Sequence, residues 1–268
     1  MSISQEGIHC NYLNEMDLVW DRPDTFTDTT LHYCPGCGHS VINRLIMESV
    51  QELNIEEKTI GVAPVGCSVF AYHYMFIDMQ EAAHGRASAV ATGIKRILPD
   101  RIVFSYQGDG DLAAIGTAET IHTVNRGENI LMLFINNGIY GMTGGQMSPT
   151  TLKGSITSTS PDGRDYNQHG YPLDITKIIA QMPGSAYVTR QSVDSANAVR
   201  KTKKAMMKSL KYQMDGGRGV CFIEIVSNCP SGWKMTPTES NEWLRNEIFN
   251  HYELGDIKQL PKLKTNEI

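Results

Sequence analysis

Short apolar runs alternate along the chain with segments of helical periodicity, and this pattern predicts an α/β fold. The apolar runs, which are rich in branched or aromatic residues and predict buried strands, are 59–63, 102–106, 130–135, 186–189 and 220–226. The segments with apolar residues at helical spacing are 38–50, 87–97, 112–126, 174–181, 192–210 and 240–252. Strands that alternate with helices favour a mostly parallel sheet covered by helices on both faces.

The stretch from Arg101 to Gln146 carries the most specific pattern. Its first strand breaks at the turn Gly108-Asp109-Gly110-Asp111, and its second strand ends in Asn136-Asn137-Gly138. The helix between them has its apolar residues at Leu112, Ile115, Ala118 and Ile121, with His122 on the same face. Open α/β sheets bind ligands at the carboxyl ends of their strands. The two polar turns therefore predict a binding site.

The chemistry of these turns suits a metal ion and a phosphate. Asp109 lies between two glycines, so the backbone can approach a ligand while the carboxylate faces it. With the amide oxygen of Asn137 and a nearby carbonyl, it would suit Mg²⁺, which takes its remaining ligands from phosphates. The glycines of 141–146 can present N–H groups to an anion. A lone GDG favours the alternative of two ordinary turns, but the pairing of both turns at this separation favours the metal site.

Composition bounds the remaining possibilities. The chain has 268 residues, of which 41% are hydrophobic and 20% charged, so we expect one large domain. Its net charge is −5 and its basic residues are scattered, so we expect no nucleic-acid partner. No apolar run approaches the roughly 20 residues of a membrane span, and the first residues lack a signal pattern. We expect a cytoplasmic protein with a polar arm at 1–30, a main domain at 31–236, and a helix with a tail at 237–268.

Six cysteines in a cytoplasmic protein indicate metal ligands or free thiols rather than disulfides. The pair Cys34 and Cys37 alone is compatible with a redox dithiol, half of a zinc ribbon or a cluster-binding pair. No second pair is available for a zinc ribbon, and a thioredoxin-like motif leaves Cys67 and Cys229 unexplained. All four lie in turns next to Gly or Pro, which supports a Cys₄ iron–sulfur site. Cys221 lies inside an apolar strand and is interpreted as a core residue.

Several motifs in series resemble one family. The GDG and NN turns match the thiamine diphosphate motif, and CPGCGH, GVAPVGCS, AAHGRASAVATGIK, NNGIYGMTGGQ and SNCPSGW extend the match over residues 31–236. The chain resembles the β subunit of 2-oxoacid:ferredoxin oxidoreductases, of the type that acts on 2-oxoglutarate or the branched-chain 3-methyl-2-oxobutanoate. The resemblance implies the thiamine diphosphate-binding fold.

The resemblance also assigns residues. It implies that a 4Fe–4S cluster is held by Cys34, Cys37, Cys67 and Cys229. Mg²⁺ would bind Asp109, Asn137 and the Ile139 carbonyl. The cofactor-binding residues would be Gly66, Cys67, Ser68, Gly108, Asp109, Gly110, Asp111, Asn137, Ile139, Gly141, Met142 and Thr143, with the diphosphate on Thr143 and on the amides around Gly141. For Asp111, a helix N-cap is the simpler interpretation, and orientation of the loop is the alternative.

His84 and Arg86 are candidate catalytic residues. They flank a glycine before a helix of small residues, where an arginine fork can bind a substrate carboxylate; a surface turn is the alternative. The aromatic stretch 69–76 is a candidate acyl pocket that favours a branched-chain substrate. The loop 150–170 is predicted to cover the cofactor or contact a partner subunit. The lysines of 201–211 fit a solvated helix face better than a ferredoxin-binding surface.

The implied activity is oxidative decarboxylation of a 2-oxoacid to acyl-CoA and CO₂, with electrons passing through the cluster to ferredoxin. The implied partners are a pyrimidine-binding α subunit, ferredoxin and coenzyme A, and the resemblance leaves open small γ and ferredoxin-like δ subunits. The α subunit would supply a carboxylate against the cofactor's pyrimidine, because neither Glu81 nor Glu119 has a context that demands this role. A non-redox thiamine diphosphate decarboxylase and a non-catalytic electron-transfer subunit are the alternatives.

Overall fold

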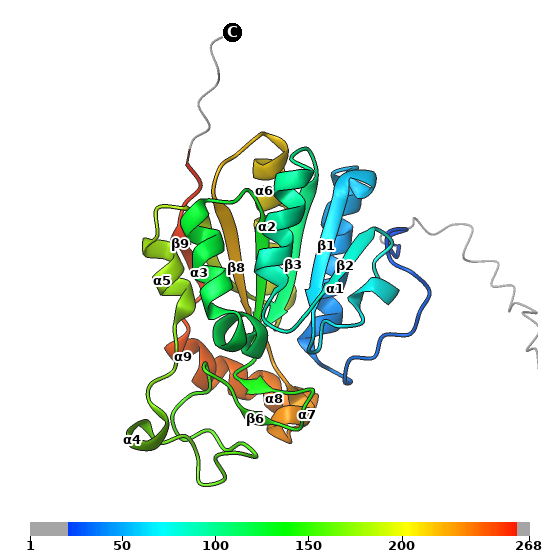
Figure 1. The fold of residues 1–268 in the computed structure, drawn as a ribbon. Helices are drawn as coiled ribbons and strands as arrows, with labels where there is room; N and C mark the ends of the chain where they lie inside the picture. The colour runs from blue at the N-terminus through cyan, green and yellow to red at the C-terminus, as the bar shows by residue number, and fades with distance from the viewer. Residues whose placement is uncertain (1–20, 262–268) are drawn as a thin grey trace, which may run out of the picture.

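A seven-stranded sheet forms the centre of the computed structural model, which describes residues 21–261 (Figure 1). The strands run in the order β2-β1-β3-β4-β8-β7-β9, and all neighbours are parallel except β7 and β9. A separate two-stranded ribbon pairs β5 with β6. The predicted α/β fold with a mostly parallel sheet is thus confirmed.

Most elements match the predicted ranges to within a few residues. The strands are β1 (Thr59–Pro64), β2 (Asp78–Ala82), β3 (Ile102–Gly108), β4 (Leu131–Asn136), β5 (Ile139–Tyr140), β6 (Gln146–Met147), β7 (Ser185–Ser192), β8 (Val220–Val226) and β9 (Gly255–Lys258). The helices are α1 (Gly38–Glu52), α2 (Ala87–Ile97), α3 (Thr117–Arg126), α4 (Tyr166–His169), α5 (Ile175–Gln181), α6 (Ala196–Met214), α7 (Pro230–Trp233), α8 (Pro237–Trp243) and α9 (Phe249–His251).

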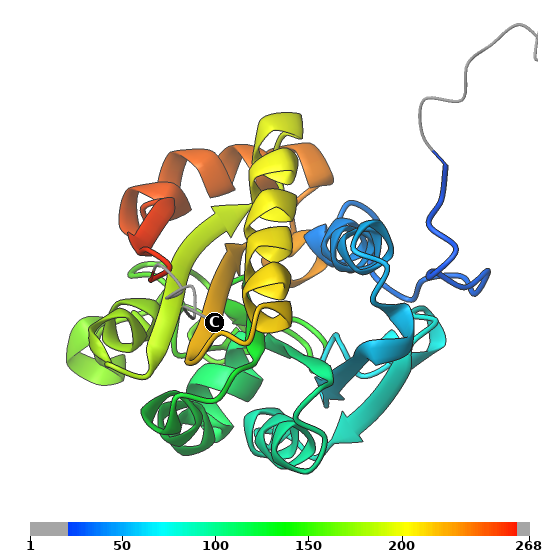
Figure 2. The ribbon, with the colours of Figure 1, turned by 90° about the horizontal axis from the view of Figure 1, so that it is seen from above.

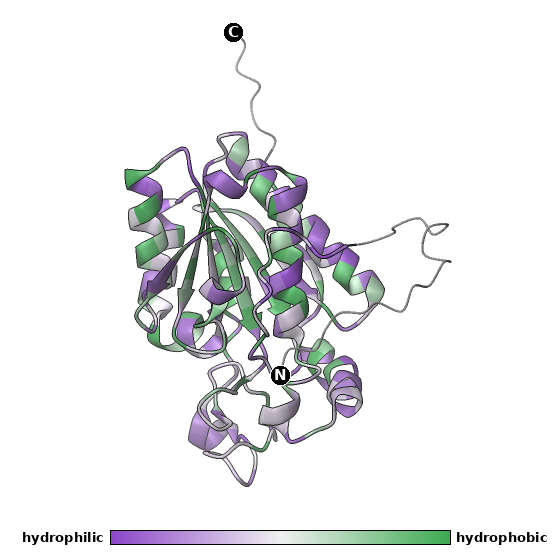
Figure 3. Cartoon of the chain, turned by 90° about the vertical axis from the view of Figure 1, so that its right-hand side faces the viewer, coloured by the Kyte–Doolittle hydropathy of each residue, from purple (hydrophilic) through white to green (hydrophobic). Residues whose placement is uncertain are grey.

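Helices cover both faces of the sheet, as predicted. Seen from above, α1 and α6 lie on one face and α2, α3 and α5 on the other (Figure 2). Successive residues of one strand face opposite layers: Phe104 and Tyr106 of β3 join the core under α1 and α6, while Val103 joins the core under α2 and α3. Figure 3 shows mostly apolar strands at the centre, enclosed by helices that carry both polar and apolar residues. The sheet is therefore buried on both faces, as parallel sheets are.

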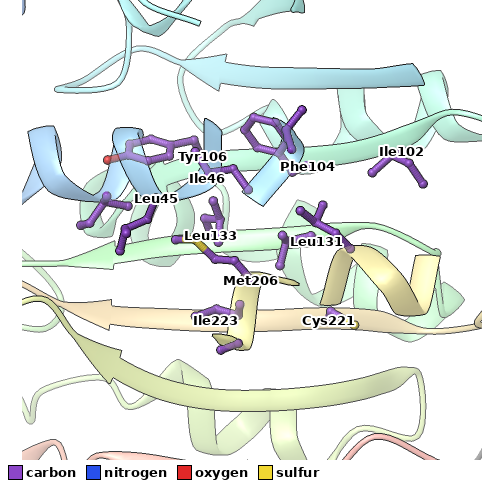
Figure 4. Close-up of a cluster of buried hydrophobic side chains, with 14 of the residues drawn as sticks. Leu45, Ile46, Ile102, Phe104, Tyr106, Leu131, Leu133, Met206, Cys221 and Ile223 are labelled. Atoms are coloured by element: carbon purple, nitrogen blue, oxygen red, sulfur yellow. The ribbon is translucent and has the colours of Figure 1, made fainter. Parts of the chain in front are cut away.

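The larger core lies between the sheet and the pair α1 and α6 (Figure 4). Its side chains come from elements far apart in the sequence, among them α1, β3, β4, α6 and β8, and Leu45, Leu133 and Met206 are almost fully buried. Cys221 lies in this core with no exposed surface, which confirms its interpretation as a core residue. Burial raises the pKa of its thiol to about 12, so it stays protonated and inert.

The helix after the GDG turn differs from the predicted one. It opens with a π-helical turn, Asp111–Ile115, and only then becomes the regular helix α3. The extra residue of a π-turn rotates the following residues relative to an α-helical register. Ile115 and His122 are therefore exposed, and Thr120 and Val124 are buried instead. The predicted apolar face was wrong for this reason.

Two edge strands were not predicted. Polar residues dominate β2, which is mostly exposed, and β9 at the opposite edge has no fully buried residue. An edge strand lacks the apolar signal of a central one. The predicted arm lies mostly outside the described residues, but Phe26 forms a bridge with Met75. Among the described helices, none has the length and apolar character needed to cross a bilayer.

Candidate functional site

The segments that follow the parallel strands gather at one end of the sheet, where β6, α7 and α8 lie (Figure 1). A pocket of about 100 Å³ opens there. Its lining residues are His39, Val65, Gly66, Cys67, Ser68, His84, Gly108, Asp109, Gly110, Asp111, Asn137, Ile139, Tyr140, Gly141, Met142 and Thr143. All the predicted cofactor-binding residues and His84 belong to this lining, so the structure brings the predicted site together.

Asp109 is the buried acidic group of the pocket. One of its carboxylate oxygens accepts the Gly110 N–H at 2.8 Å, and the other accepts the Thr150 hydroxyl at 3.1 Å. Burial raises its pKa to about 6, although these donors and the Ile139 N–H oppose the shift. A buried carboxylate with a raised pKa gains from a bound cation. A Cβ on Gly110 would lie 2.5 Å from the Tyr140 ring, so only glycine fits there.

Asn137 lies beside Asp109 through the turn after β4. Its amide oxygen accepts the Ile139 N–H at 3.3 Å, the same N–H that interacts with the Asp109 carboxylate. The three predicted Mg²⁺ ligands are thus adjacent, and their oxygen donors fit that ion. Thr151 holds the turn from outside, because its hydroxyl donates to the Gly138 carbonyl at 2.6 Å.

A buried ion-pair network supports the same turn from behind. Glu224 of β8 accepts the Asn136 amide at 2.7 Å and the Arg190 guanidinium at 2.5 Å. Arg190 also pairs with Asp174 at 2.5 Å, and its guanidinium lies over the ring of Tyr252. Arg190 and Glu224 are each about 1% exposed, so each charged group depends on its partners to offset the cost of burial.

The loop 150–170 is anchored to the site by its first residues and by Arg164. The Tyr252 hydroxyl donates to the Thr150 carbonyl at 2.9 Å. Arg164 is buried and donates to six backbone carbonyls, those of Ser148, Pro149, Thr151, His169, Gly170 and Tyr171. One side chain therefore holds both ends of the loop, and the start of the loop supports Asp109. The sequence offered no specific signal for Thr150 or Arg164.

The structure corrects the role of Asp111. Its carboxylate accepts His84 Nδ1 at 2.7 Å, the Gly85 N–H at 2.5 Å and the Gln107 amide at 2.6 Å. It makes no helix-capping hydrogen bond, so the N-cap interpretation was wrong and the orienting one was right. The residue fixes the turn before α2 and holds His84 at the edge of the pocket.

Arg86 and the aromatic stretch lie outside this pocket lining. Arg86 forms an ion pair with Glu119, one of the two glutamates considered as activating groups. Glu81 is exposed on the edge strand β2. In the stretch 69–76, Tyr74 and Met75 are buried in the core, while Phe76 is 73% exposed. The predicted acyl pocket is therefore not part of this lining.

The four cysteines predicted to bind a cluster lie near the same turns. From a Cβ built on Gly141, the sulfurs of Cys229 and Cys67 lie 3.0 and 4.0 Å away. Cys37 Sγ lies 3.8 Å from the Asn228 carbonyl, next to Cys229, and Cys34 is exposed in the same turn as Cys37. Burial, together with the neighbouring Cys37 thiol, raises the pKa of Cys67 and Cys229 to about 12. All four are free thiols.

Within residues 21–261, no group of three or more His, Cys, Asp or Glu side chains could hold a metal ion. A single ion needs its ligands close to one point, with about 2.3 Å from zinc to each thiolate. A 4Fe–4S cluster instead spreads its thiolates over separate iron atoms. The arrangement therefore disfavours a zinc site, and the cluster stays a prediction.

His39 is a pocket residue that the sequence did not single out. It lies in the first turn of α1, is 3% exposed, and its Nδ1 lies 2.8 Å from the Tyr106 hydroxyl. Burial, with a smaller effect of His32, lowers its pKa to about 4. Its position directly after the Cys37-Gly38 turn was the only available signal, and that signal does not predict which way the side chain faces.

Known proteins match the chain in sequence and in structure. A family described as "Thiamine pyrophosphate enzyme, C-terminal TPP binding domain" matches residues 64–225; thiamine pyrophosphate is another name for thiamine diphosphate. The ketoisovalerate oxidoreductase subunit VorA of Methanothermobacter marburgensis is 41% identical over 90% of this chain and 50% of its own length. The 2-oxoglutarate synthase subunit KorB of Methanocaldococcus jannaschii is 40% identical over 74% of this chain and 69% of its own.

A solved structure extends the match. The 2-oxoglutarate:ferredoxin oxidoreductase from Magnetococcus marinus, with 2-oxoglutarate, coenzyme A and succinyl-CoA bound, superposes with a TM-score of 0.71. It is 28% identical, and the alignment covers 85% of this chain and 73% of the matched chain. The chain spans about half the length of the VorA relatives that it matches.

Proposed function

The chain belongs to the family of thiamine diphosphate-binding subunits of 2-oxoacid oxidoreductases, and from that premise we propose that it is the cofactor-binding subunit of a CoA-dependent 2-oxoacid:ferredoxin oxidoreductase. The observation that carries the proposal is the meeting of the GDG turn with the NNGIYG turn in one pocket. This pocket combines the buried Asp109 carboxylate, which can bind a metal ion, with a glycine-rich loop.

In this proposal, the Asp109 carboxylate, the Asn137 amide oxygen and the Ile139 carbonyl would hold Mg²⁺, which would offset the negative charge of the diphosphate. Burial raises the pKa of Asp109 because it destabilises the charged carboxylate, and a bound cation would stabilise that charge. The N–H groups of Gly141 and Met142 would hold the phosphate oxygens together with the Thr143 hydroxyl, which donates to Gln146 Oε1 at 2.6 Å in this structure. Thiamine diphosphate supplies the electron sink for decarboxylation, and the protein supplies position and electrostatics.

Cys34, Cys37, Cys67 and Cys229 are proposed to hold a 4Fe–4S cluster next to this loop. Two of their sulfurs lie against Gly141, so cluster and cofactor would share a wall of the site. The buried thiols, whose pKa burial raises, gain a partner when a cluster binds them as thiolates. Electrons would leave the site through it to ferredoxin.

The pocket supports the proposal that the active site is completed by another subunit. The pocket holds about 100 Å³ and adjoins a second cavity of about 840 Å³ that shares Asn137, Ile139 and Gly141 with it. Neither Glu81 nor Glu119 lines the pocket. We therefore propose that a pyrimidine-binding α subunit covers the cofactor and supplies the activating carboxylate.

The substrate is proposed to be 3-methyl-2-oxobutanoate or 2-oxoglutarate. The VorA relatives are named for ketoisovalerate, which is 3-methyl-2-oxobutanoate, and the KorB relatives for 2-oxoglutarate. His84, which lines the pocket, is proposed to contact the substrate. Arg86 would reach it only if its pairing with Glu119 opened.

The test is activity of the complex purified with this chain. We expect 2-oxoacid- and CoA-dependent reduction of ferredoxin, measured over a panel of 2-oxoacids that includes both candidates. Decarboxylation that proceeds without CoA and without electron transfer would indicate the alternative, a non-redox decarboxylase. A complex that transfers electrons but binds no thiamine diphosphate would indicate the other alternative, a non-catalytic electron-transfer subunit.

A further inference from the structure

His39 lies between the cysteine turn and the cofactor pocket and faces both through different atoms. Its backbone N–H, with that of Gly38, interacts with the Cys37 thiol. His39 is buried and is one of the residues that line the pocket that contains Asp109 and His84. The backbone of His39 thus contacts the Cys37 sulfur, and we assign its imidazole ring to the pocket.

The ring is held in one orientation. Tyr33 stacks on it, with 5.1 Å between ring centroids and 9° between the ring planes. The Tyr106 hydroxyl lies 2.8 Å from Nδ1, and Asn43 Nδ2 lies 3.1 Å from the same hydroxyl. A ring fixed on one face and at one nitrogen has little freedom, and Tyr106 itself is fully buried in the core.

The hydrogen bonds also select the tautomer. The amide nitrogen of Asn43 can only donate, so the Tyr106 oxygen is its acceptor. The hydroxyl hydrogen of Tyr106 then has His39 Nδ1 as its acceptor. In a neutral imidazole whose Nδ1 accepts, the hydrogen resides on Nε2. His39 is therefore set to act as a donor through Nε2, the atom with no hydrogen-bond partner among the described residues.

We propose that His39 is a substrate-binding residue that donates a hydrogen bond from Nε2 to an oxygen atom of the 2-oxoacid in the cofactor pocket. Tyr106 and Asn43 are positioning residues that keep the donor hydrogen on Nε2. The proposal rests on the proposed function, because it needs a 2-oxoacid beside the bound cofactor. A fixed neutral donor stabilises negative charge that develops on such an oxygen.

Two substitutions distinguish the role of Nδ1 of His39 from that of Nε2. His39→Asn keeps a polar atom near the position of Nδ1 and removes the donor at Nε2, whereas His39→Gln places an amide donor near Nε2. Loss of one donor of this kind costs about 10²–10³-fold in rate. We expect His39→Asn to lower kcat/KM for the 2-oxoacid about 100-fold and His39→Gln to recover most of it. Tyr106→Phe should lower it about tenfold, because Nδ1 loses the donor that selects the tautomer.

The experiment uses the purified complex and three readouts: kcat/KM for the 2-oxoacid, the Kd for thiamine diphosphate with Mg²⁺, and the midpoint potential of the iron–sulfur signal. We expect His39→Asn to change only the first, and the same exchange at an exposed histidine outside the site, His122→Asn, to change none. If His39→Asn retains full kcat/KM, or if it loses cofactor affinity or shifts the potential instead, the substrate-binding role is wrong. A wild-type complex that binds no thiamine diphosphate would refute the proposed function itself. If His39→Asn does not fold, a His39→Gln variant no more active than His39→Ala refutes the donor.

Discussion

The cofactor turns and the cysteine turns lie side by side, but they are built in different ways. The cofactor turns come from one strand–helix–strand unit, and Asp109 and Asn137 already have hydrogen-bond partners within the chain. The cysteines come from three distant segments that meet only through the sheet order. Their thiols are free, and the contact near Cys37 is with a carbonyl at 3.8 Å.

This difference indicates how each region depends on its ligand. A pre-formed set of oxygen donors would need little rearrangement to bind the proposed Mg²⁺, because Thr150, Thr151 and the Glu224 network hold these donors in place. The cysteine turns have side-chain support as well, because the Asn228 amide donates to the Gly36 carbonyl at 3.0 Å and the Ser68 hydroxyl donates to the Pro64 carbonyl at 3.2 Å. Burial nonetheless raises the pKa of the Cys67 and Cys229 thiols to about 12, so we expect a cluster that binds the thiolates to stabilise these turns further. Damage to one region should therefore leave the other functional, and the following predictions test that independence.

The largest effect is expected for Asp109→Ala, which removes the charged ligand of the metal. Mg²⁺-dependent binding of thiamine diphosphate should be lost, while the fold remains. At a ligand concentration of about one hundred times Kd, the wild type should gain about 2.7 kcal/mol, or roughly 5–10 °C in Tm. The mutant should gain nothing. Asp162→Ala, in the exposed part of the loop, is the control, and an unchanged cofactor shift in Asp109→Ala would refute the metal assignment.

Cys229→Ser should remove the cluster and spare the cofactor. Anaerobically prepared wild type should contain four iron atoms and four sulfides per chain with a 4Fe–4S spectrum by electron paramagnetic resonance. Cys221→Ser is the matched control, because that thiol is buried in the core away from the site. Equal loss in both variants, or zinc in place of iron, would contradict the cluster. The Kd for thiamine diphosphate should stay within about twofold in Cys229→Ser.

Thr150→Val should weaken the metal site without abolishing it. Substitution of a residue that orients a metal ligand typically costs about 10–100-fold in metal affinity, and we expect about tenfold for Mg²⁺. The Thr150 hydrogen bond lowers the pKa of Asp109, which burial raises to about 6. Because only the carboxylate binds the ion, Mg²⁺ affinity should fall as pH drops through about 6. In Thr150→Val this fall should begin at higher pH. Calorimetric titrations from pH 5 to 8, with Thr29→Val as the exposed control, would measure both effects. Equal pH profiles of Mg²⁺ affinity in the wild type and in Thr150→Val would contradict the proposed role of Thr150.

The smallest effect on cofactor binding is expected for Gly36→Ala in the cysteine turn. Gly36 has φ of +75°, and a Cβ there would lie 2.4 Å from Cβ of Pro237. Gly216 has a similar φ of +71° but open space around it, so Gly216→Ala isolates the backbone strain of about 1–2 kcal/mol. Gly36→Ala should lose more stability than this and should also retain less iron. Equal unfolding free energies and equal iron content would show that Pro237 does not constrain the turn.

The sequence predicted the central strands and the cofactor turns because both are local patterns. Apolar runs such as 220–226 are buried on both faces, and the GDG and NN turns follow directly from the strands that position them. The edge strands β2 and β9 were missed because they are polar, and the α3 face was wrong because the π-turn at Asp111–Ile115 shifts the register.

The missed site residues act through contacts that no local pattern encodes. Thr150 reaches Asp109 from a loop 41 residues away in the chain, and Glu224 reaches Asn136 across the sheet. His39 follows a recognisable cysteine motif, but only the packing of Tyr33 and Tyr106 sets its orientation. Such residues become visible when the tertiary structure is known.

The central claim is that this chain holds the cofactor but lacks the group that activates it. Hydrogen–deuterium exchange at C2 of thiamine diphosphate, followed by NMR on the isolated chain and on the complex with its partner, tests this most directly. We predict exchange on the isolated chain close to that of free cofactor, and exchange about 10²–10⁴-fold faster in the complex, as a positioned acid–base group would give. Fast exchange on the isolated chain that disappears in Glu119→Gln or Glu81→Gln would place the activating carboxylate in this chain and contradict the account.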